Sequence, residues 1–286
     1  MNPPAGRDPD WGAIWPAPAK LNLMLHVLGR RADGYHTLQT AFQFLDYADG
    51  LHFLPAPDGR ITRPVGLAGL SEDQDLVVRA ASLLQAETGC GQGAEIHVSK
   101  RIPDGGGLGG GSSDAATTLV ALNHYWGTRL DRERLQEIGA TLGADVPVFV
   151  AGRAAWAEGI GQQLTPLDLP QPWYLVIAPD CRVRTADVFQ EPGLTRNSAP
   201  ITISRFLAHG GGNDCTAVVR HRYPKVARAL DWLGQFGHAR LTGTGACVFA
   251  AFDGEREARE AGAKAPPEWL AFVAAGRNRS PLLDFT

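Results

Sequence analysis

Apolar and polar residues alternate near the start of the chain, and this alternation predicts a strand that begins near Ala17. The apolar positions are Ala19, Leu21, Leu23, Leu25 and Val27, and they alternate with Lys20, Asn22, Met24 and His26. A period of two is typical of a half-buried strand, in which one face joins the core. The spacing places Lys20 and Asn22 together on the other face, about 6.5 Å apart and near enough to contact one substrate. A solvated strand face is the plain alternative for these two side chains.

Further periodicities predict helices and strands along the rest of the chain. Helices are expected over residues 75–87, 112–126, 135–142, 214–235 with a break at Pro224, and 255–261. Strands are expected over residues 94–100 and 173–178, on both sides of a glycine turn within 239–249, and over 269–275. Residues 46–63 are rich in Pro, Gly and Asp and predict turns and a hairpin. Because the alternation fades over residues 154–172, we expect one lobe over residues 11–163 and a second over residues 164–286.

Six glycines in seven positions lie between the strand predicted over 94–100 and the helix predicted over 112–126. Glycine allows successive backbone N–H groups to point into one concavity, and the helix that follows adds its free N-terminal amides. The segment from Pro103 to Ser113 therefore predicts a loop that binds an oligophosphate.

Two other glycine-rich phosphate-binding motifs match this sequence less well. Gly105, Gly107 and Gly110 match the spacing of a dinucleotide fingerprint, but a helix follows where that fold needs a second strand ending in an acidic residue. A Walker A loop needs a lysine after its last glycine, and here Ser112 and Ser113 follow Gly111. A flexible linker is the plain alternative, and the periodic elements on both sides argue against it.

Composition narrows the possible partners. The chain has 286 residues, is 44% hydrophobic and carries a net charge of −3, so it can form two lobes and has no basic excess for nucleic acid or an anionic membrane. No apolar run approaches the 18 residues of a membrane span. The four cysteines have no metal-ligand spacing and are interpreted as reduced, buried thiols: Cys90, Cys181, Cys215 and Cys247. We expect a cytoplasmic protein.

Two further sites carry candidate chemistry. Asp145 lies between the end of the helix predicted over 135–142 and an apolar segment, where it could be a catalytic base or a helix N-cap. Tyr35 and His36 follow a turn at residues 30–34 and could stack on a planar base and bond its edge. An aromatic side chain at a strand edge is the plain alternative.

These segments together resemble the GHMP kinase superfamily. The resemblance is carried by residues 18–23 (Pro-Ala-Lys-Leu-Asn-Leu), 29–36 (Gly-Arg-Arg-Ala-Asp-Gly-Tyr-His), the loop 103–113, 142–147 (Leu-Gly-Ala-Asp-Val-Pro) and 241–249. They occur in the family's order over nearly the whole chain. The Asp-Gly-Tyr-His sequence narrows the match to the 4-diphosphocytidyl-2-C-methyl-D-erythritol kinase family.

The resemblance implies an α+β, two-lobed GHMP kinase fold, with an N-terminal lobe like ribosomal S5 domain 2, a ferredoxin-like C-terminal lobe and an active site between them. It also implies ATP-dependent phosphorylation of the 2-hydroxyl of the methylerythritol moiety, in the non-mevalonate route to isoprenoid precursors. The partners would then be ATP with Mg²⁺ and a small-molecule substrate, a cytidine diphosphate methylerythritol, with no nucleic acid and no membrane.

The family's site residues map onto this sequence position by position. Lys20 and Asp145 match the catalytic pair, and five residues match the substrate-binding set: Asn22, Tyr35, His36, Thr185 and Phe189. Lys100 leads into the ATP loop, which comprises Pro103, Asp104, Gly105, Gly106, Gly107, Leu108, Gly109, Gly110, Gly111, Ser112 and Ser113. Ser112 is the expected Mg²⁺ ligand.

Three residues depart from the family's pattern. Asp75 replaces an asparagine that often contacts adenine, Asp104 adds a negative charge to the loop, and Ala186 replaces a frequent proline. Asp104 should therefore point away from the phosphates or lie beside Lys100 or Arg101. Two other functions stay open: another small-molecule kinase of the superfamily, and a non-catalytic sensor on the same fold.

Overall fold

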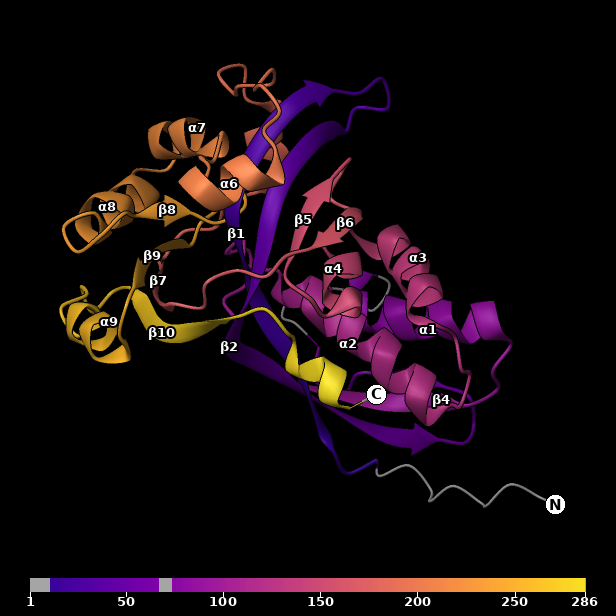
Figure 1. Ribbon diagram of the computed structural model, residues 1–286. Coiled ribbons are helices and arrows are strands. Elements are labelled where there is room, and N and C mark those ends of the chain that lie inside the picture. Colours follow the sequence, from indigo (N-terminus) through magenta and orange to yellow (C-terminus); the bar gives the residue numbers. More distant parts are fainter. Residues whose placement is uncertain (1–10, 67–73, 286) are drawn as a thin grey trace.

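Two long antiparallel strands run through the molecule (Figure 1). The computed structural model describes residues 11–66 and 74–285, and its first elements are β1 (Ile14–Arg30) and β2 (His36–Ala56). The turns predicted over residues 46–56 are wrong, because β2 continues to Ala56, whereas a turn does follow at residues 57–58. Its second half pairs with the start of β1 and with β4 (Gly93–Ser99), and its apolar residues Leu51 and Phe53 are buried.

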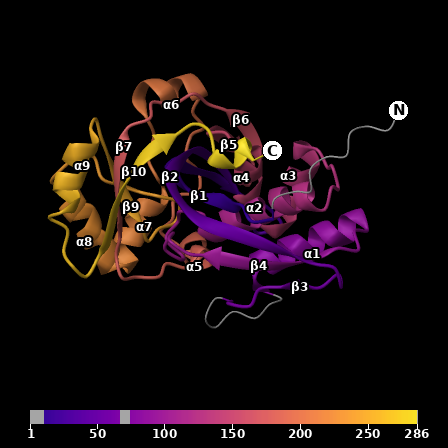
Figure 2. The ribbon, with the colours of Figure 1, turned by 90° about the horizontal axis from the view of Figure 1, so that it is seen from below.

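Helices cover one face of the sheet in the N-terminal half of the chain. The sheet adds β3 (Ile61–Thr62) beside β4, and the hairpin β5 (Ala155–Glu158) and β6 (Gln163–Pro166) beside β2. The covering helices are α1 (Leu76–Thr88), α2 (Gly110–Tyr125), α3 (Arg132–Leu142) and α4 (Val146–Ala151), which gather on one side of the strands in Figure 2. Their apolar faces and the sheet enclose one hydrophobic core.

The second half of the chain builds a smaller set of strands with its own core. The strands are β7 (Trp173–Ala178), β8 (Arg240–Leu241), β9 (Val248–Phe252) and β10 (Leu270–Arg277). The helices are α5 (Thr185–Gln190), α6 (Ile203–His209), α7 (Cys215–Arg222), α8 (Pro224–Leu233) and α9 (Glu255–Gly262), and the 3-10 helix η2 (Pro281–Asp284) follows β10. The break at Pro224 and the closing strand are confirmed.

The two halves meet on β1, β2 and β10. β10 pairs with β7 along its length and with β2 at its end, where Gly276 lies opposite Leu45. A third group of buried residues lies between β1, β2 and the strands of the second half. The half-buried interpretation of β1 is therefore wrong: α2 packs on one face and the second half of the chain covers the other, and both Lys20 and Asn22 are buried.

The segment of fading alternation, residues 154–172, contains the β5–β6 hairpin. The hairpin was missed because its two strands have only four residues each, too few for a period to show. The division between residues 163 and 164 stays a prediction.

The structure also tests the expectations about cysteines and membranes. In the described part of the chain all four cysteines are free, with Cys215 and Cys247 buried and Cys90 and Cys181 only partly so. The prediction of buried thiols is thus correct for two of them. None of the helices in residues 11–66 and 74–285 is long and apolar enough to cross a membrane.

Candidate active site

A cavity of about 670 Å³ lies between the two halves of the molecule. It brings together all of the residues singled out for catalysis and substrate binding and two residues of the predicted ATP loop: Lys20, Asn22, Tyr35, His36, Asp145, Thr185 and Phe189, with Gly107 and Ser112. These residues come from β1, β2, α2, α4 and α5 and from the turns beside them. Side chains that are 169 positions apart in the sequence therefore face one cleft.

Lys20 is held by contacts from three parts of the chain. Its ammonium donates to Asn22 Oδ1 on the same strand and to the carbonyl oxygen of Gly107 in the glycine loop, at 3.1 Å. It also lies 3.1 Å from Asp145 Oδ2, and its side chain is only 3% exposed. An ammonium has three N–H donors, so all of them have an acceptor. The strand, the loop and the start of α4 are thereby tied to one charge.

Asp145 begins α4 but does not cap it. Its backbone has helical φ and ψ, and its side chain makes no hydrogen bond to the first turn. The carboxylate instead pairs with Lys20 and keeps a third of its surface exposed. Asp145 thus holds the N-cap position, but its side chain does not play the capping role of the alternative interpretation. Among the described residues only its Oδ2 has a partner, so Oδ1 can meet a ligand in the cavity.

A second network joins Asn22 and the loop to the C-terminal half. Asn22 donates its backbone N–H to Thr242 Oγ1 at 3.0 Å and its amide to Thr40 Oγ1 at 2.8 Å. Thr242 in turn donates to the carbonyl oxygen of Gly107 at 3.1 Å. Thr40 and Thr242 were missed as site residues; the only sequence signal was that Thr242 lies in a segment that resembles the family.

The glycine loop leads directly into α2. Gly105, Gly107 and Gly109 adopt positive φ of 64°, 75° and 73°, which side chains rarely allow. Gly109 is the N-cap of α2, so the N–H groups of the first helical turn have no partner within the helix. Such N–H groups and the helix dipole favour an anion at this end.

Close packing also requires glycine in this loop. A Cβ at Gly109 would lie 2.7 Å from Phe149 and 3.0 Å from Lys20 Cε, and one at Gly107 would meet the carbonyl oxygen of Thr242. Ser112 lines the cavity, whereas Ser113 is fully buried. Within the described residues, Ser113 Oγ has no hydrogen-bond partner.

Lys100 lies behind the loop and pairs with two carboxylates. Its Nζ is 2.5 Å from Asp49 Oδ2 and 2.9 Å from Asp114 Oδ2. Burial alone would lower the pKa of Lys100, but the two carboxylates raise it above its ordinary value. Burial raises the pKa of Asp114 to about 7. Asp49 also accepts from the backbone N–H of Ile102 at 2.8 Å, so this cluster anchors the start of the loop.

Two of the three departures from the family's pattern, Asp75 and Asp104, can be followed in the contacts of their side chains, and the third, Ala186, lies on α5 and lines the cavity. Asp75 is buried, pairs with Arg63 and caps α1 through the backbone N–H of Val77 at 2.9 Å. Asp104 is exposed, and none of the ion pairs found among the described residues includes it. Of the two cations expected beside it, Lys100 pairs with Asp49 and Asp114 and Arg101 lies over the Tyr47 ring.

At the other end of the cleft lie the three rings expected to hold a base. Tyr35 is 61% exposed on the turn between β1 and β2, and His36 begins β2. The His36 and Phe189 rings stack, with centroids 4.9 Å apart and planes 24° apart. Burial, together with the positive charges of Arg196 and Arg30, lowers the pKa of His36.

Hydroxyl groups and one arginine complete this end. Thr185 Oγ1 lies 3.0 Å from Thr244 Oγ1, which joins α5 to the turn before β9. Arg196 contacts both His36 and the backbone of Phe189. Sequence reasoning missed Thr244 and Arg196, and no pattern around Arg196 signals its position.

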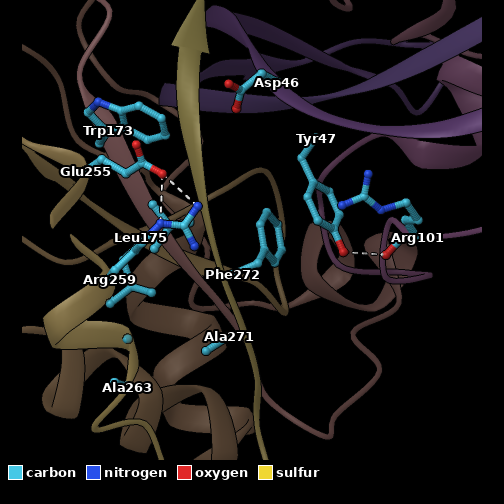
Figure 3. Close-up of a pocket in the computed structure, with 12 residues that line it drawn as sticks. Asp46, Tyr47, Arg101, Trp173, Leu175, Glu255, Arg259, Ala263, Ala271 and Phe272 are labelled. Carbon is cyan, nitrogen blue, oxygen red and sulfur yellow. Dashed lines mark hydrogen bonds and ion pairs between the residues drawn. The ribbon is translucent and has the colours of Figure 1, made fainter.

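A second hollow lies away from the catalytic pair (Figure 3). It has a volume of about 730 Å³ and is lined by parts of β2, β7, α9 and β10. Tyr47 stacks on Phe272 there, with ring centroids 3.9 Å apart, and Arg101 lies over the Tyr47 ring. Glu255 and Arg259 pair at 2.7 Å. Its charged side chains thus have partners already, and neither Lys20 nor Asp145 lines it.

Comparison with known proteins identifies the family. Models named "GHMP kinases N terminal domain" and "GHMP kinases C terminal" match residues 75–153 and 196–270. The chain is 60% identical over 271 residues to a 4-diphosphocytidyl-2-C-methyl-D-erythritol kinase of Nitrosococcus oceani, covering 95% of this chain and 97% of the relative. A relative of the same name from Halorhodospira halophila is 56% identical, covering 96% of each. The chain belongs to the 4-diphosphocytidyl-2-C-methyl-D-erythritol kinase family.

Solved structures agree with this assignment. A crystal structure of 4-(cytidine 5'-diphospho)-2C-methyl-D-erythritol kinase superposes with a TM-score of 0.80 at 33% identity, covering 92% of this chain and 99% of that one. The Methanococcus jannaschii mevalonate kinase superposes with a TM-score of 0.68 at 16% identity, covering 97% of this chain and all of that one, and shows the shared fold alone. The chain is thus a small-molecule kinase with the two-lobed GHMP fold that the sequence predicted.

Proposed function

We propose that this protein transfers the terminal phosphoryl group of ATP to the 2-hydroxyl of 4-diphosphocytidyl-2-C-methyl-D-erythritol. The observation that carries the proposal is that one cavity holds the Lys20–Asp145 pair at one end and the stacked His36 and Phe189 rings at the other. The family membership supports the same reaction, since the relatives are named for this substrate. The product would be an intermediate of the non-mevalonate route to isoprenoid precursors.

The catalytic pair would act mainly by position and charge. Asp145 would accept or orient the proton of the substrate hydroxyl, because its carboxylate is open to the cavity. Lys20 would orient Asp145 and offset negative charge, because its ammonium is fixed by Asn22 and Gly107. Phosphoryl transfer leaves the protein little covalent chemistry, so positioning and electrostatics account for most of the rate.

The residues of the loop fit the phosphates of ATP. The N–H groups at the start of α2, which have no partner within the helix, follow Gly109, and Gly107, with its positive φ, lines the cavity. Among the described residues no cluster of three acidic, histidine or cysteine side chains could hold a metal alone. Mg²⁺ would therefore bind chiefly through ATP, with Ser112 as its expected protein ligand, and would offset charge on the transferred group.

An assay of ATP consumption tests the proposal. The cytidine substrate should support turnover, whereas mevalonate and homoserine should not. Turnover with another alcohol in place of the cytidine substrate would indicate a different kinase of the superfamily. ATP binding without turnover on any of the three would indicate a non-catalytic sensor.

A further inference from the structure

Arg196 holds the base end of the cleft together, although no motif and no family resemblance gave it a role. It lies in the segment after α5. Its Nη2 donates to the carbonyl oxygens of Phe189 at 2.8 Å and Glu191 at 2.7 Å, and its Nη1 donates to that of Leu194 at 3.1 Å. Three bonds to backbone fix the plane of the guanidinium group.

The Nε–H of the same group donates to Nε2 of His36 at 3.3 Å. A guanidinium group can donate hydrogen bonds but cannot accept them, so Nε2 of His36 must be unprotonated. The neutral ring then carries its hydrogen on Nδ1. Burial and the nearby charges of Arg196 and Arg30 lower the pKa of His36, which keeps the ring neutral near pH 7. Within the described part of the chain, Nδ1 has no hydrogen-bond partner, and His36 lines the cavity.

The ring geometry leaves room for a base beside His36. The centroids of His36 and Phe189 are 4.9 Å apart, more than the contact distance of about 3.5–4.0 Å between stacked carbons, so the rings are offset. A base stacked on the uncovered part of Phe189 would lie close to the imidazole plane, because the two planes differ by only 24°. An in-plane N–H of His36 would then point at the edge of the base.

The hydrogen on Nδ1 of His36 can distinguish cytosine from uracil. N3 of cytosine is a hydrogen-bond acceptor, whereas N3 of uracil carries a hydrogen. We propose that Arg196 sets a preference for cytosine by holding His36 in the Nδ1–H form, which donates to N3 of cytosine and opposes N3–H of uracil. Arg196 acts through His36 and is a positioning residue. The inference rests on the proposed function, since it presupposes a cytidine substrate.

The test compares kcat/KM for the cytidine substrate and its uridine counterpart in variants of the full chain. Arg196→Met removes every donor and keeps an apolar stem, and Arg205→Met on α6 is the matched control because Arg205 is exposed and outside the cleft. We expect the cytidine preference to fall roughly ten- to a hundred-fold in Arg196→Met, the range for one specific contact to a base edge. The loss should lie in KM for the pyrimidine substrate, with KM for ATP unchanged, and Arg205→Met should match the unmutated protein.

A double-mutant cycle shows whether Arg196 acts through His36. In a His36→Ala background, Arg196→Met should change the preference no further. Nitrogen-15 NMR of the unmutated protein should show the Nδ1–H form of His36, and Arg196→Met should lose it. If Arg196→Met does not fold, Arg196→Lys takes its place, since a lysine keeps the charge but cannot reach three carbonyls and His36 in one plane.

The possible outcomes separate the inference from the proposed function. Three results would overturn the role of Arg196 and leave the kinase assignment intact. The first is an unchanged cytidine preference in folded Arg196→Met, and the second is an equal fall in that preference when Arg196→Met is made in the His36→Ala background. The third is a His36 ring that carries its hydrogen on Nε2 in the unmutated protein. An unmutated protein that does not phosphorylate the cytidine substrate would overturn both.

Discussion

The two ends of the cleft are built differently. At the reacting end, Lys20 is almost completely buried and its ammonium meets three acceptors from three parts of the chain. At the base end, Tyr35 is exposed on a turn, and His36 is held by an arginine 160 positions away. The reacting end is fixed by close packing, so its variants should lose rate, and those that add a side chain to the packed loop should lose stability as well. The base end is held by ring stacking and by the hydrogen bonds of Arg196, away from the Lys20–Asp145 pair, so its variants should lose substrate affinity instead.

Asp145→Asn should show the largest effect on catalysis. The amide oxygen can still accept a hydrogen bond from Lys20, but the side chain can no longer take a proton. We expect kcat to fall roughly 10²- to 10⁴-fold, the range for a positioned acid–base group, with ATP affinity and thermal stability nearly unchanged. Steady-state kinetics, calorimetry and a melting curve measure the three quantities. Full activity in a folded Asp145→Asn protein would show that the carboxylate is not the base.

Gly107→Val should disturb the reacting end through packing. The positive φ of Gly107 and the close approach of the Thr242 carbonyl leave no room for a side chain, so we expect a loss of about 2–5 kcal/mol in the free energy of unfolding. ATP binding should be abolished. Cytidine substrate affinity should fall as well, because Gly107 O also supports Lys20 and Thr242.

Gly111→Ala is the matched control for this loop. A Cβ at Gly111 would lie 3.6 Å from Leu76 Cδ1, an ordinary contact, and its φ is not positive. Alanine favours a helix by up to about 1 kcal/mol, so the free energy of unfolding should stay equal or rise slightly. Chemical denaturation measures the free energy of unfolding of both variants. A Gly107→Val protein as stable as the unmutated protein would contradict the packing argument.

Tyr35→Ala and Phe189→Ala should act on affinity alone. Stacking on an aromatic ring contributes about 1–3 kcal/mol per base, so KM for the cytidine substrate should rise roughly ten- to a hundred-fold. KM for ATP should not change, because none of the ring contacts found among the described residues joins Tyr35 or Phe189 to the glycine loop or to the Lys20–Asp145 pair. A fall in kcat with unchanged KM would argue that these rings do not hold the base.

The smallest expected effect is a pH dependence that arises from His36. Its pKa is lowered in the folded protein by burial and by Arg196 and Arg30, so the unfolded chain binds more protons below about pH 6.5. This contribution to stability is therefore present above pH 6.5 and is lost as the pH falls. The slope cannot exceed about 1.4 kcal/mol per pH unit for one proton. Denaturation between pH 5 and 8 should show a shallower decline for His36→Asn than for the unmutated protein.

Local patterns predicted the candidate site better than they predicted the fold around it. Sequence reasoning found the glycine loop, Lys20, Asn22 and Asp145, because the residue types within each short segment indicate a possible chemistry. The extent of β2 was missed, because its second half contains Asp46, Asp49 and Gly50, which usually mark turns. Pairing with β1 and β4 on both sides outweighs that local preference.

The sequence by itself identified the family and predicted a phosphate-binding loop and the pair Lys20 and Asp145 as catalytic residues, because each lies in a short segment of recognisable residue types. Only the tertiary structure decided that Asp145 pairs with Lys20 rather than capping α4, that Thr242 joins the loop to the C-terminal half, and that Arg196 contacts His36. The physical reason is that each of these contacts joins residues at least 125 positions apart. No periodicity or local propensity records which distant side chains the packing of two halves brings within hydrogen-bonding distance.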